Sequence, residues 1–189
     1  MIFAKALLFA GVLQGAAAAP FAEDVARFAE LDRANPPAQG QVLFIGSSSF
    51  TMWEDVQARF PGVPLLNRAF GGSQLPHLIQ HLDRIVTPYA PRKVVVYCGE
   101  NDLAGDPSLP AYKVAERFEA LHGLIRDRLP SVPIVYVSMK PSPSRYHLRA
   151  KFIAGNRWIR EFCDSQKDTS FVDVWPLMLG SDNFPREEL

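Results

Sequence analysis

Short, unbroken runs of apolar residues alternate along the chain with longer segments in which apolar residues return every three or four positions. The runs are rich in β-branched side chains, and the strongest is KVVVYCG at residues 93–99. Runs of this length and composition predict strands that are buried on both faces. The predicted strands cover residues 41–46, 64–67, 93–99, 133–139 and 169–175.

The segments between these runs have the spacing of helices with one apolar face. Residues 111–130, for example, place Val114, Phe118 and Leu121 on one stripe. The predicted helices cover residues 21–35, 52–60, 75–86, 111–130 and 148–162. Strands that alternate with helices predict an α/β fold. We therefore expect a three-layer α/β/α sandwich around a five-stranded, doubly wound parallel sheet.

The N-terminus departs from this pattern. Lys5 is followed by the apolar stretch ALLFAGVL and then by QGAAAAP, which ends in small residues. A basic start, a short apolar core and an A-x-A-like site are typical of a secretory signal peptide. We predict a signal peptide over residues 1–19, a single domain over residues 20–189, and export to the periplasm or the extracellular space. The apolar run is too short to predict stable insertion in a membrane.

Charge excludes some classes of partner. The chain has 20 basic and 20 acidic residues among 189, so its formal net charge is zero. No overall field favours nucleic acid, and a small or neutral substrate suits this balance better. Cys98 and Cys163 are too few for a disulfide framework. We expect both to pack as small apolar residues.

Polar and small residues follow the predicted strands, where the ligand of such a fold sits. These loops read GSSSF, NRAFGGSQ, CGENDLAG and SMKPSPSR. Each has an ordinary structural explanation when taken alone. A serine caps a helix, paired glycines turn the chain, and Asn101 forms an Asx turn.

Taken together, the loops suit nucleophilic catalysis. A serine after a buried strand presents its hydroxyl at the edge of the sheet, near backbone N–H groups that stabilise a developing oxyanion. A glycine in the second loop allows close approach to a substrate, and an asparagine adds a donor without adding charge. A phosphate-binding loop is less favoured, because the chain lacks a G-x-x-x-x-G-K pattern.

The blocks FIGSSSF, NRAFGGSQ and GENDL, in this order on successive strand ends, resemble the SGNH (GDSL-like) hydrolases, a superfamily with a flavodoxin-like fold. The resemblance runs from about Phe21 to Leu189. It implies that Ser48 is the nucleophile and that Gly72 and Asn101 form the oxyanion hole, with Ser47 in the place usually held by Asp. It also implies hydrolysis of short-chain or carbohydrate acyl esters, with no metal or organic cofactor.

The resemblance also implies a general base, supplied in that superfamily by an Asp-x-x-His block before a final helix. The sequence has no such block, and no histidine follows His147. We therefore expect the domain to be C-terminally incomplete, without its final helix, and to expose apolar surface.

The four histidines are weak substitutes for that base. His77 and His81 lie one helical turn apart, but no carboxylate or cysteine completes a metal cluster beside them. His122 is expected in mid-helix, and His147 alone follows a strand-end loop. Arg68, Gln74 and Arg145 are equally open to substrate contact and to a structural role.

Two functions remain open. The first is a truncated copy of an exported serine ester hydrolase that acts through an acyl-enzyme. The alternative is a non-catalytic module that binds a small ligand on the same scaffold without the catalytic Asp and His. A third hypothesis, an interaction protein, has no apolar stripe or charge run to support it.

Overall fold

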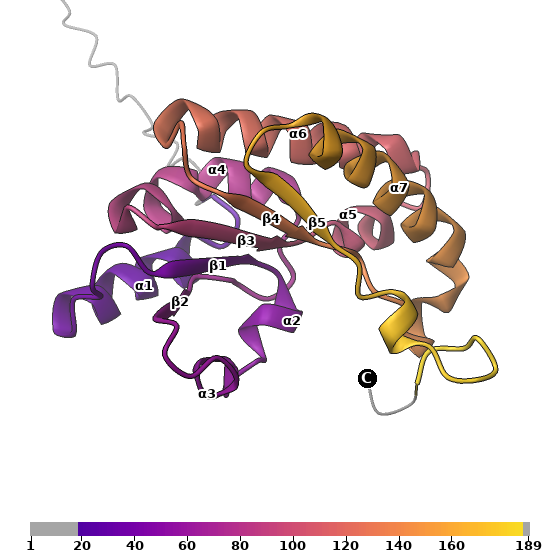
Figure 1. Ribbon diagram of the computed structural model, residues 1–189, viewed down its shortest axis with the longest axis horizontal. Coiled ribbons are helices and arrows are strands. Elements are labelled where there is room, and N and C mark those ends of the chain that lie inside the picture. Colours follow the sequence, from indigo (N-terminus) through magenta and orange to yellow (C-terminus); the bar gives the residue numbers. More distant parts are fainter. Residues whose placement is uncertain (1–18, 187–189) are drawn as a thin grey trace, which may run out of the picture.

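The computed structural model describes residues 19–186, so the predicted signal peptide lies outside the described residues except for Ala19. Five parallel strands form one sheet in the order β2-β1-β3-β4-β5 (Figure 1). This is the predicted α/β architecture. The strands are β1 (Val42–Gly46), β2 (Leu65–Asn67), β3 (Lys93–Tyr97), β4 (Ile134–Val137) and β5 (Thr169–Val172).

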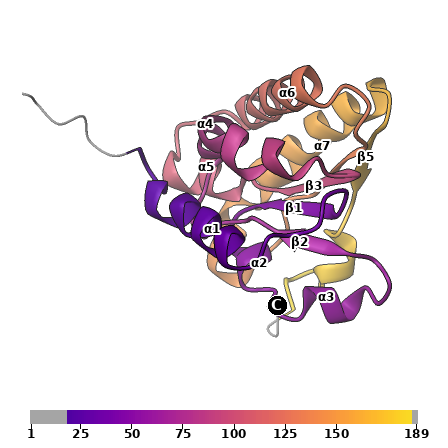
Figure 2. The ribbon, with the colours of Figure 1, turned by 90° about the vertical axis from the view of Figure 1, so that its left-hand side faces the viewer.

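Four long helices cover one face of the sheet. The largest core cluster joins Leu43 and Ile45 of β1 with Val96 of β3, Phe118 and Phe152, all almost fully buried. Burial of such side chains contributes about 1.5–3 kcal/mol each, which makes this layer the main source of stability. Figure 2 shows the helix over residues 22–34 beside the helix over residues 75–85. The four helices are α1 (Ala22–Ala34), α4 (Leu75–Ile85), α6 (Ala111–Arg128) and α7 (Arg149–Ser165).

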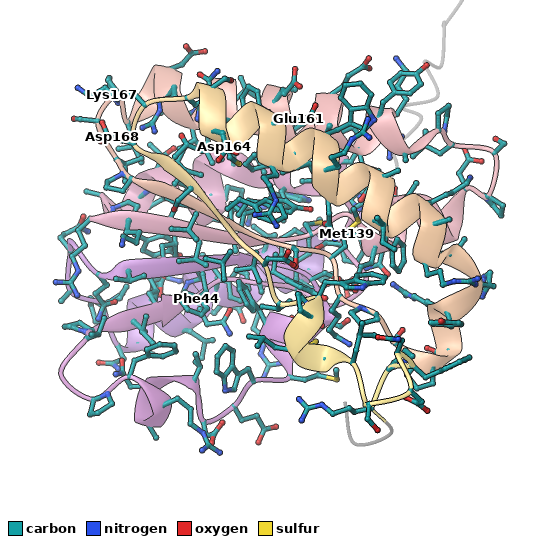
Figure 3. All side chains as sticks on the ribbon, turned by 45° about the vertical axis from the view of Figure 1, so that its right-hand side comes forward. Phe44, Met139, Glu161, Asp164, Lys167 and Asp168 are labelled. Carbon is teal, nitrogen blue, oxygen red and sulfur yellow. The ribbon has the colours of Figure 1, made fainter. Side chains whose placement is uncertain are left out.

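The opposite face is covered by two short helices, α2 (Ser48–Thr51) and α3 (Val56–Arg59), which lie below the sheet in Figure 1. They enclose a smaller core cluster around Phe44, which Figure 3 labels, together with Phe50 and Tyr97. These helices leave β5, at the edge of the sheet, partly uncovered, because Val172 is 44% exposed.

An apolar groove of about 510 Å³ crosses this second face and is lined by residues of all five strands. Val135 and Val137 of β4 are half-buried, and Val172 of β5 is 44% exposed. The groove is lined mainly by valines and aromatic rings. The described residues therefore expose apolar surface on this face.

The structure corrects two of the predicted elements. The helix expected over residues 52–60 is replaced by α2 and α3, which are separated by a turn. A short helix, α5 (Glu100–Gly105), occupies the segment interpreted as a loop. Single-turn helices have too few residues for a periodic pattern. Three 3₁₀ segments, η1 (Thr87–Tyr89), η2 (Pro143–Leu148) and η3 (Pro176–Met178), complete the described elements.

The strand order fixes where a ligand can bind. After β1 the chain moves outward to β2, and after β2 it returns across the sheet to β3. The loops after β1 and β3 therefore diverge at the same edge of the sheet. Such a switch point is the usual ligand site of a doubly wound fold. No helix within residues 19–186 is long and apolar enough to cross a membrane.

Candidate active site

Gly46 ends β1 at a point where only glycine fits. Its φ is +143°, and a Cβ atom there would lie 2.0 Å from the carbonyl oxygen of Tyr97 in β3. The next residue, Ser47, donates its backbone N–H to the same carbonyl at 3.0 Å. The tight contact places the three serines over the carboxyl end of β3.

Ser48 is the first residue of α2 and is half-buried. Within residues 19–186 its hydroxyl and its backbone N–H have no hydrogen-bond partner. Its Cβ atom stands 4.0 Å from the position that a Cβ atom on Gly71 would take. Ser48, the first of the predicted site residues, therefore lies beside the glycine loop, and its hydroxyl and N–H are free to bind a ligand.

Gly72 lies in that loop with a φ of +79°, a left-handed conformation that favours glycine. Its N–H is exposed and donates to no other group among the described residues. The neighbouring Ser73 anchors the loop, because its hydroxyl donates to the Gly46 carbonyl at 3.0 Å. The second predicted residue thus has a free donor on a fixed backbone.

Asn101 lies in the first turn of α5 and connects three loops. Its Nδ2 group donates to the Ser47 hydroxyl at 2.7 Å and to the Ser73 carbonyl at 2.9 Å. Its Oδ1 atom accepts from the Arg145 guanidinium at 2.7 Å. The structure therefore brings the loops of Ser48, Gly72 and Asn101 to one place. Their catalytic roles remain a prediction.

Buried carboxylates hold α5 in position. Asp102 accepts from the backbone N–H of Leu75 at 3.2 Å and from Arg117 at 2.7 Å. Burial raises the pKa of Asp102, and the hydrogen bond from Arg117 opposes that rise. Glu100 accepts from the backbone N–H of Lys140 at 3.1 Å, and burial likewise raises its pKa.

Three of the four histidines have other partners, and the fourth is exposed. His77 accepts from the backbone N–H of Gln74 at 3.0 Å, and His81 lies 2.6 Å from the Pro20 carbonyl oxygen. His122 meets Thr169 at 3.0 Å, and His147 is exposed in η2. None of them hydrogen-bonds to Ser48. The described part of the chain also contains no group of three His, Cys, Asp or Glu side chains placed to hold a metal ion.

Arg68, Gln74 and Arg145, the three residues considered for substrate contact, lie in different surroundings. Arg68 is buried in an ion pair with Asp32, so it is a structural residue. Gln74 donates to the Asn101 carbonyl at 3.1 Å and caps α4. Arg145 alone reaches a side chain of the site.

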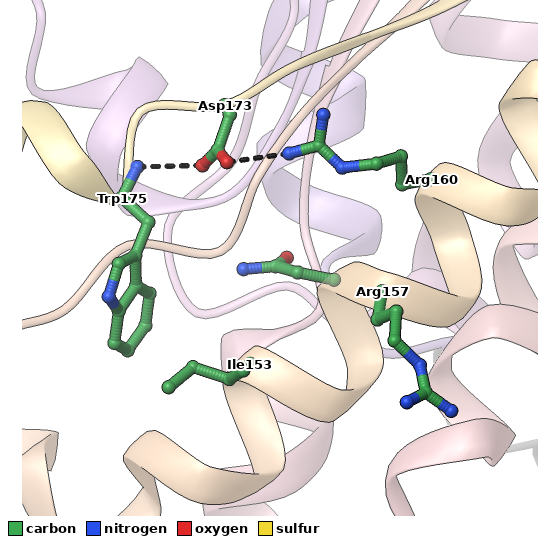
Figure 4. Close-up of a pocket in the computed structure, with 6 residues that line it drawn as sticks. Ile153, Arg157, Arg160, Asp173 and Trp175 are labelled. Atoms are coloured by element: carbon green, nitrogen blue, oxygen red, sulfur yellow. Dashed lines mark hydrogen bonds and ion pairs between the residues drawn. The ribbon is translucent and has the colours of Figure 1, made fainter.

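A cavity of about 340 Å³ lies between α7 and the segment after β5, as Figure 4 shows. Asp173 is already paired there with Arg160 at 2.5 Å and with the Trp175 backbone N–H at 3.0 Å. No serine, threonine or cysteine lines it. This cavity therefore offers no side chain that could act as a serine-type nucleophile.

A second cavity, of about 460 Å³, opens beside α2. Its walls are mainly apolar, and Ser49 and Lys140 are among its few polar residues. The Tyr97 hydroxyl is buried beside Ser49 and Glu100. The cavity places an apolar surface next to the serine loop.

Comparison with known proteins identifies the family and the fold of this chain. The sequence profile of the GDSL-like lipase/acylhydrolase family matches residues 37–189. No protein with a curated description matches the sequence.

Several solved structures share the fold. A candidate platelet activating factor from Streptococcus pneumoniae has a TM-score of 0.75 at 20% identity, covering 88% of this chain and 80% of its own. A GDSL-like lipase from Bacteroides thetaiotaomicron has a TM-score of 0.68 at 18% identity, covering 84% and 82%. A mutant acetyl-xylooligosaccharide esterase from Geobacillus stearothermophilus has a TM-score of 0.57 at 15% identity, covering 80% and 89%.

Proposed function

This chain belongs to the GDSL-like lipase/acylhydrolase family, and we propose that it is a serine ester hydrolase whose nucleophile is Ser48. One observation carries the proposal. The Ser48 hydroxyl has no partner among the described residues and lies beside loops whose donors come from Gly72 and Asn101. A nucleophile next to prealigned donors is the arrangement that acyl transfer needs.

In the proposed reaction, the Ser48 oxygen attacks the ester carbonyl carbon while a base takes the hydroxyl proton. The carbonyl oxygen becomes negatively charged. It then accepts hydrogen bonds from the Gly72 N–H and from a donor beside Asn101. The ester C–O bond then breaks, and the alcohol leaves with the proton from the base. Water attacks the acyl-enzyme in the same way and releases the acid and free Ser48.

The base is the part of this mechanism that the described residues do not supply. By the family resemblance, we propose that an Asp-x-x-His pair provides it. The proposed mechanism needs no metal or organic cofactor.

The substrate we propose is a small-molecule or carbohydrate ester with a short acyl group. The apolar cavity beside Ser49 could hold such an acyl group against Phe50 and Trp53, which line it. The balanced charge gives no reason to expect nucleic acid as a partner. We further propose that residues 1–19 are a signal peptide that directs the single domain to the periplasm or outside the cell.

The alternative is a binding module that holds the same ligand without turnover. The hydrogen bonds of His77, His81 and His122 to other groups favour it. In this alternative the Ser48 loop binds an acylated sugar and no acyl-enzyme forms.

Hydrolysis of aryl acetate and butyrate esters tests the proposal. With imidazole added as an external base, we expect the wild-type chain to release the phenol faster than imidazole alone, Ser48→Ala to fall to that background rate, and Ser49→Ala to retain the activity. Equal rates for wild type and Ser48→Ala would contradict the assignment. Saturable binding of an acetylated sugar without any hydrolysis would favour the binding module.

A further inference from the structure

Both N–H groups of the Asn101 side chain are already used inside the protein. One donates to the Ser47 hydroxyl and the other to the Ser73 carbonyl. An oxyanion can therefore receive a direct hydrogen bond from Asn101 only if one of these contacts is weakened. The Ser47 hydroxyl, which accepts one of these hydrogen bonds, could itself donate to the oxyanion while both contacts of Asn101 stay intact.

Ser47 has an unused donor. Its oxygen accepts from Asn101 at 2.7 Å, while its own proton has no acceptor within residues 19–186. Ser47 is only 4% exposed. A buried donor without a partner costs about 1–3 kcal/mol, and a ligand oxygen that accepts from it recovers that cost.

The backbone of Ser47 is fixed on both sides. Its N–H donates to Tyr97 at 3.0 Å, and its carbonyl accepts from the backbone N–H groups of Phe50 and Thr51 at 3.1 and 3.2 Å. A hydroxyl on so rigid a backbone is prealigned for a ligand next to Ser48.

Arg145 is the first donor in this series of hydrogen bonds. The Arg145 guanidinium donates to Asn101 Oδ1 at 2.7 Å, and no carboxylate of the described residues lies within ion-pair distance of it. Consecutive hydrogen bonds polarise one another, and a charged first donor increases the effect. Arg145 also fixes the orientation of the amide, because its donors can only face Oδ1.

We infer that Arg145, Asn101 and Ser47 form a polarised hydrogen-bond chain whose last donor, the Ser47 hydroxyl, binds the oxyanion of the substrate. Arg145 is a positioning residue in this chain, and Ser47 is a further oxyanion-hole residue. The inference rests on the proposed function. It also explains the departure from the family pattern at position 47, because an ionised Asp there has no proton to donate.

The rate at which a fluorophosphonate reacts with Ser48 tests the chain. We expect Ser47→Ala to slow the reaction about 100-fold, as loss of an oxyanion-hole donor does. Arg145→Met slows it roughly tenfold through the lost polarisation, and Arg145→Lys restores part of the rate. The double variant is no slower than Ser47→Ala alone, because both changes act on one donor.

A matched control separates this effect from a loss of structure. Arg149→Met removes a neighbouring arginine that lies over the Tyr146 ring. This variant should keep the wild-type rate. Added guanidinium should accelerate Arg145→Ala and leave Ser47→Ala unchanged, a readout that a merely structural role would not move. Additive losses, or no loss in Ser47→Ala, would overturn the inference.

Titration with acetate, monitored by the ¹⁵N resonance of the Asn101 side chain, needs no reaction at Ser48. We expect a saturable shift in wild type that is lost in Ser47→Ala and retained in Ser49→Ala. If the phosphonate does not react but this pattern is found, the proposed hydrolase is wrong and the hydrogen-bond chain stands. An Asn101 resonance that does not respond to acetate, or responds equally in Ser47→Ala, overturns the chain.

Discussion

A buried network around Arg68 joins the N-terminal helix to the sheet. The guanidinium pairs with Asp32 of α1, donates to the Tyr89 hydroxyl at 2.9 Å, and lies over the ring of Phe28. The Tyr89 hydroxyl in turn donates to Asp32 at 2.6 Å. Burial and the hydrogen bond to Asp32 raise the pKa of Tyr89, so the phenol stays protonated and remains a donor.

Removing one member of this network leaves a buried group without its partner. We expect Arg68→Met to lower the free energy of unfolding by about 3 kcal/mol, because Asp32 keeps its charge without a counterion. The control is Arg59→Met, whose exposed pair with Asp55 should contribute less than about 1 kcal/mol. Urea unfolding measures both, and losses of equal size would show that Arg68 is not a structural anchor.

His122 makes stability depend on pH. Burial, with a smaller effect of Arg126, lowers its pKa from 6.5 to about 4. Between these two values the unfolded chain binds a proton that the folded chain does not. The free energy of unfolding therefore falls as the pH falls from 6.5 toward 4, by at most about 1.4 kcal/mol per pH unit.

Replacing His122 by Gln should remove this part of the pH dependence. Urea unfolding of wild type and His122→Gln at pH 7, 6 and 5 gives the difference. We expect the two curves to converge as the pH falls. His147→Gln, at an exposed position, should keep the wild-type slope. Parallel curves for wild type and His122→Gln would mean that His122 has an ordinary pKa.

At the scale of the elements, contact between β1 and β3 sets the geometry of the serine loop. A methyl group on Gly46 would overlap the Tyr97 carbonyl and would need a φ that alanine rarely adopts. We expect Gly46→Ala to destabilise the protein by several kcal/mol, or to prevent folding. Gly123→Ala is the control, because nothing lies within 4 Å of its Cβ position in mid-helix. That change should stabilise α6 by about 0.5–1 kcal/mol, as thermal unfolding will show.

The long elements could be predicted from the sequence because their signals are repeated. The stripe of Val114, Phe118 and Leu121 identifies α6, and the β-branched run identifies β3, in both cases to within a few residues. The helix α5 gives no such signal. Its only local indication is Gly99, whose φ of +130° turns the chain before the acidic first turn.

Within the site, the sequence identifies Ser48, Gly72 and Asn101 by type and order, and the structure brings their loops together. The contact of Arg145 with Asn101 spans 44 positions, and no local pattern encodes such a distance. For the same reason, the sequence does not separate Arg68 from Arg145. Both follow a strand, and only the fold shows that one is buried against Asp32.

At the scale of the whole molecule, the two faces of the sheet differ. Four long helices cover one face, whereas the apolar groove on the other leaves Val172 44% exposed. Apolar surface of this kind binds hydrophobic dyes and promotes association. The formal net charge of zero adds no repulsion between molecules.

We expect Val172→Lys to reduce the fluorescence of the dye ANS and to raise solubility. Leu31→Lys is the control, because Leu31 is similarly exposed, at 52%, but lies on α1, away from the groove. It should leave the ANS signal unchanged. A sharp, cooperative thermal transition in a monomeric sample that binds no ANS would contradict the expected exposure.

Covalent labelling tests most directly whether Ser48 is the nucleophile of the site. The chain is treated with a fluorophosphonate, digested, and the modified peptide is sequenced by mass spectrometry. We predict one phosphonyl group on Ser48, absent from Ser48→Ala and from protein unfolded in urea. Labelling of Ser47 or Ser49 instead, or no labelling of the folded chain, would contradict the account.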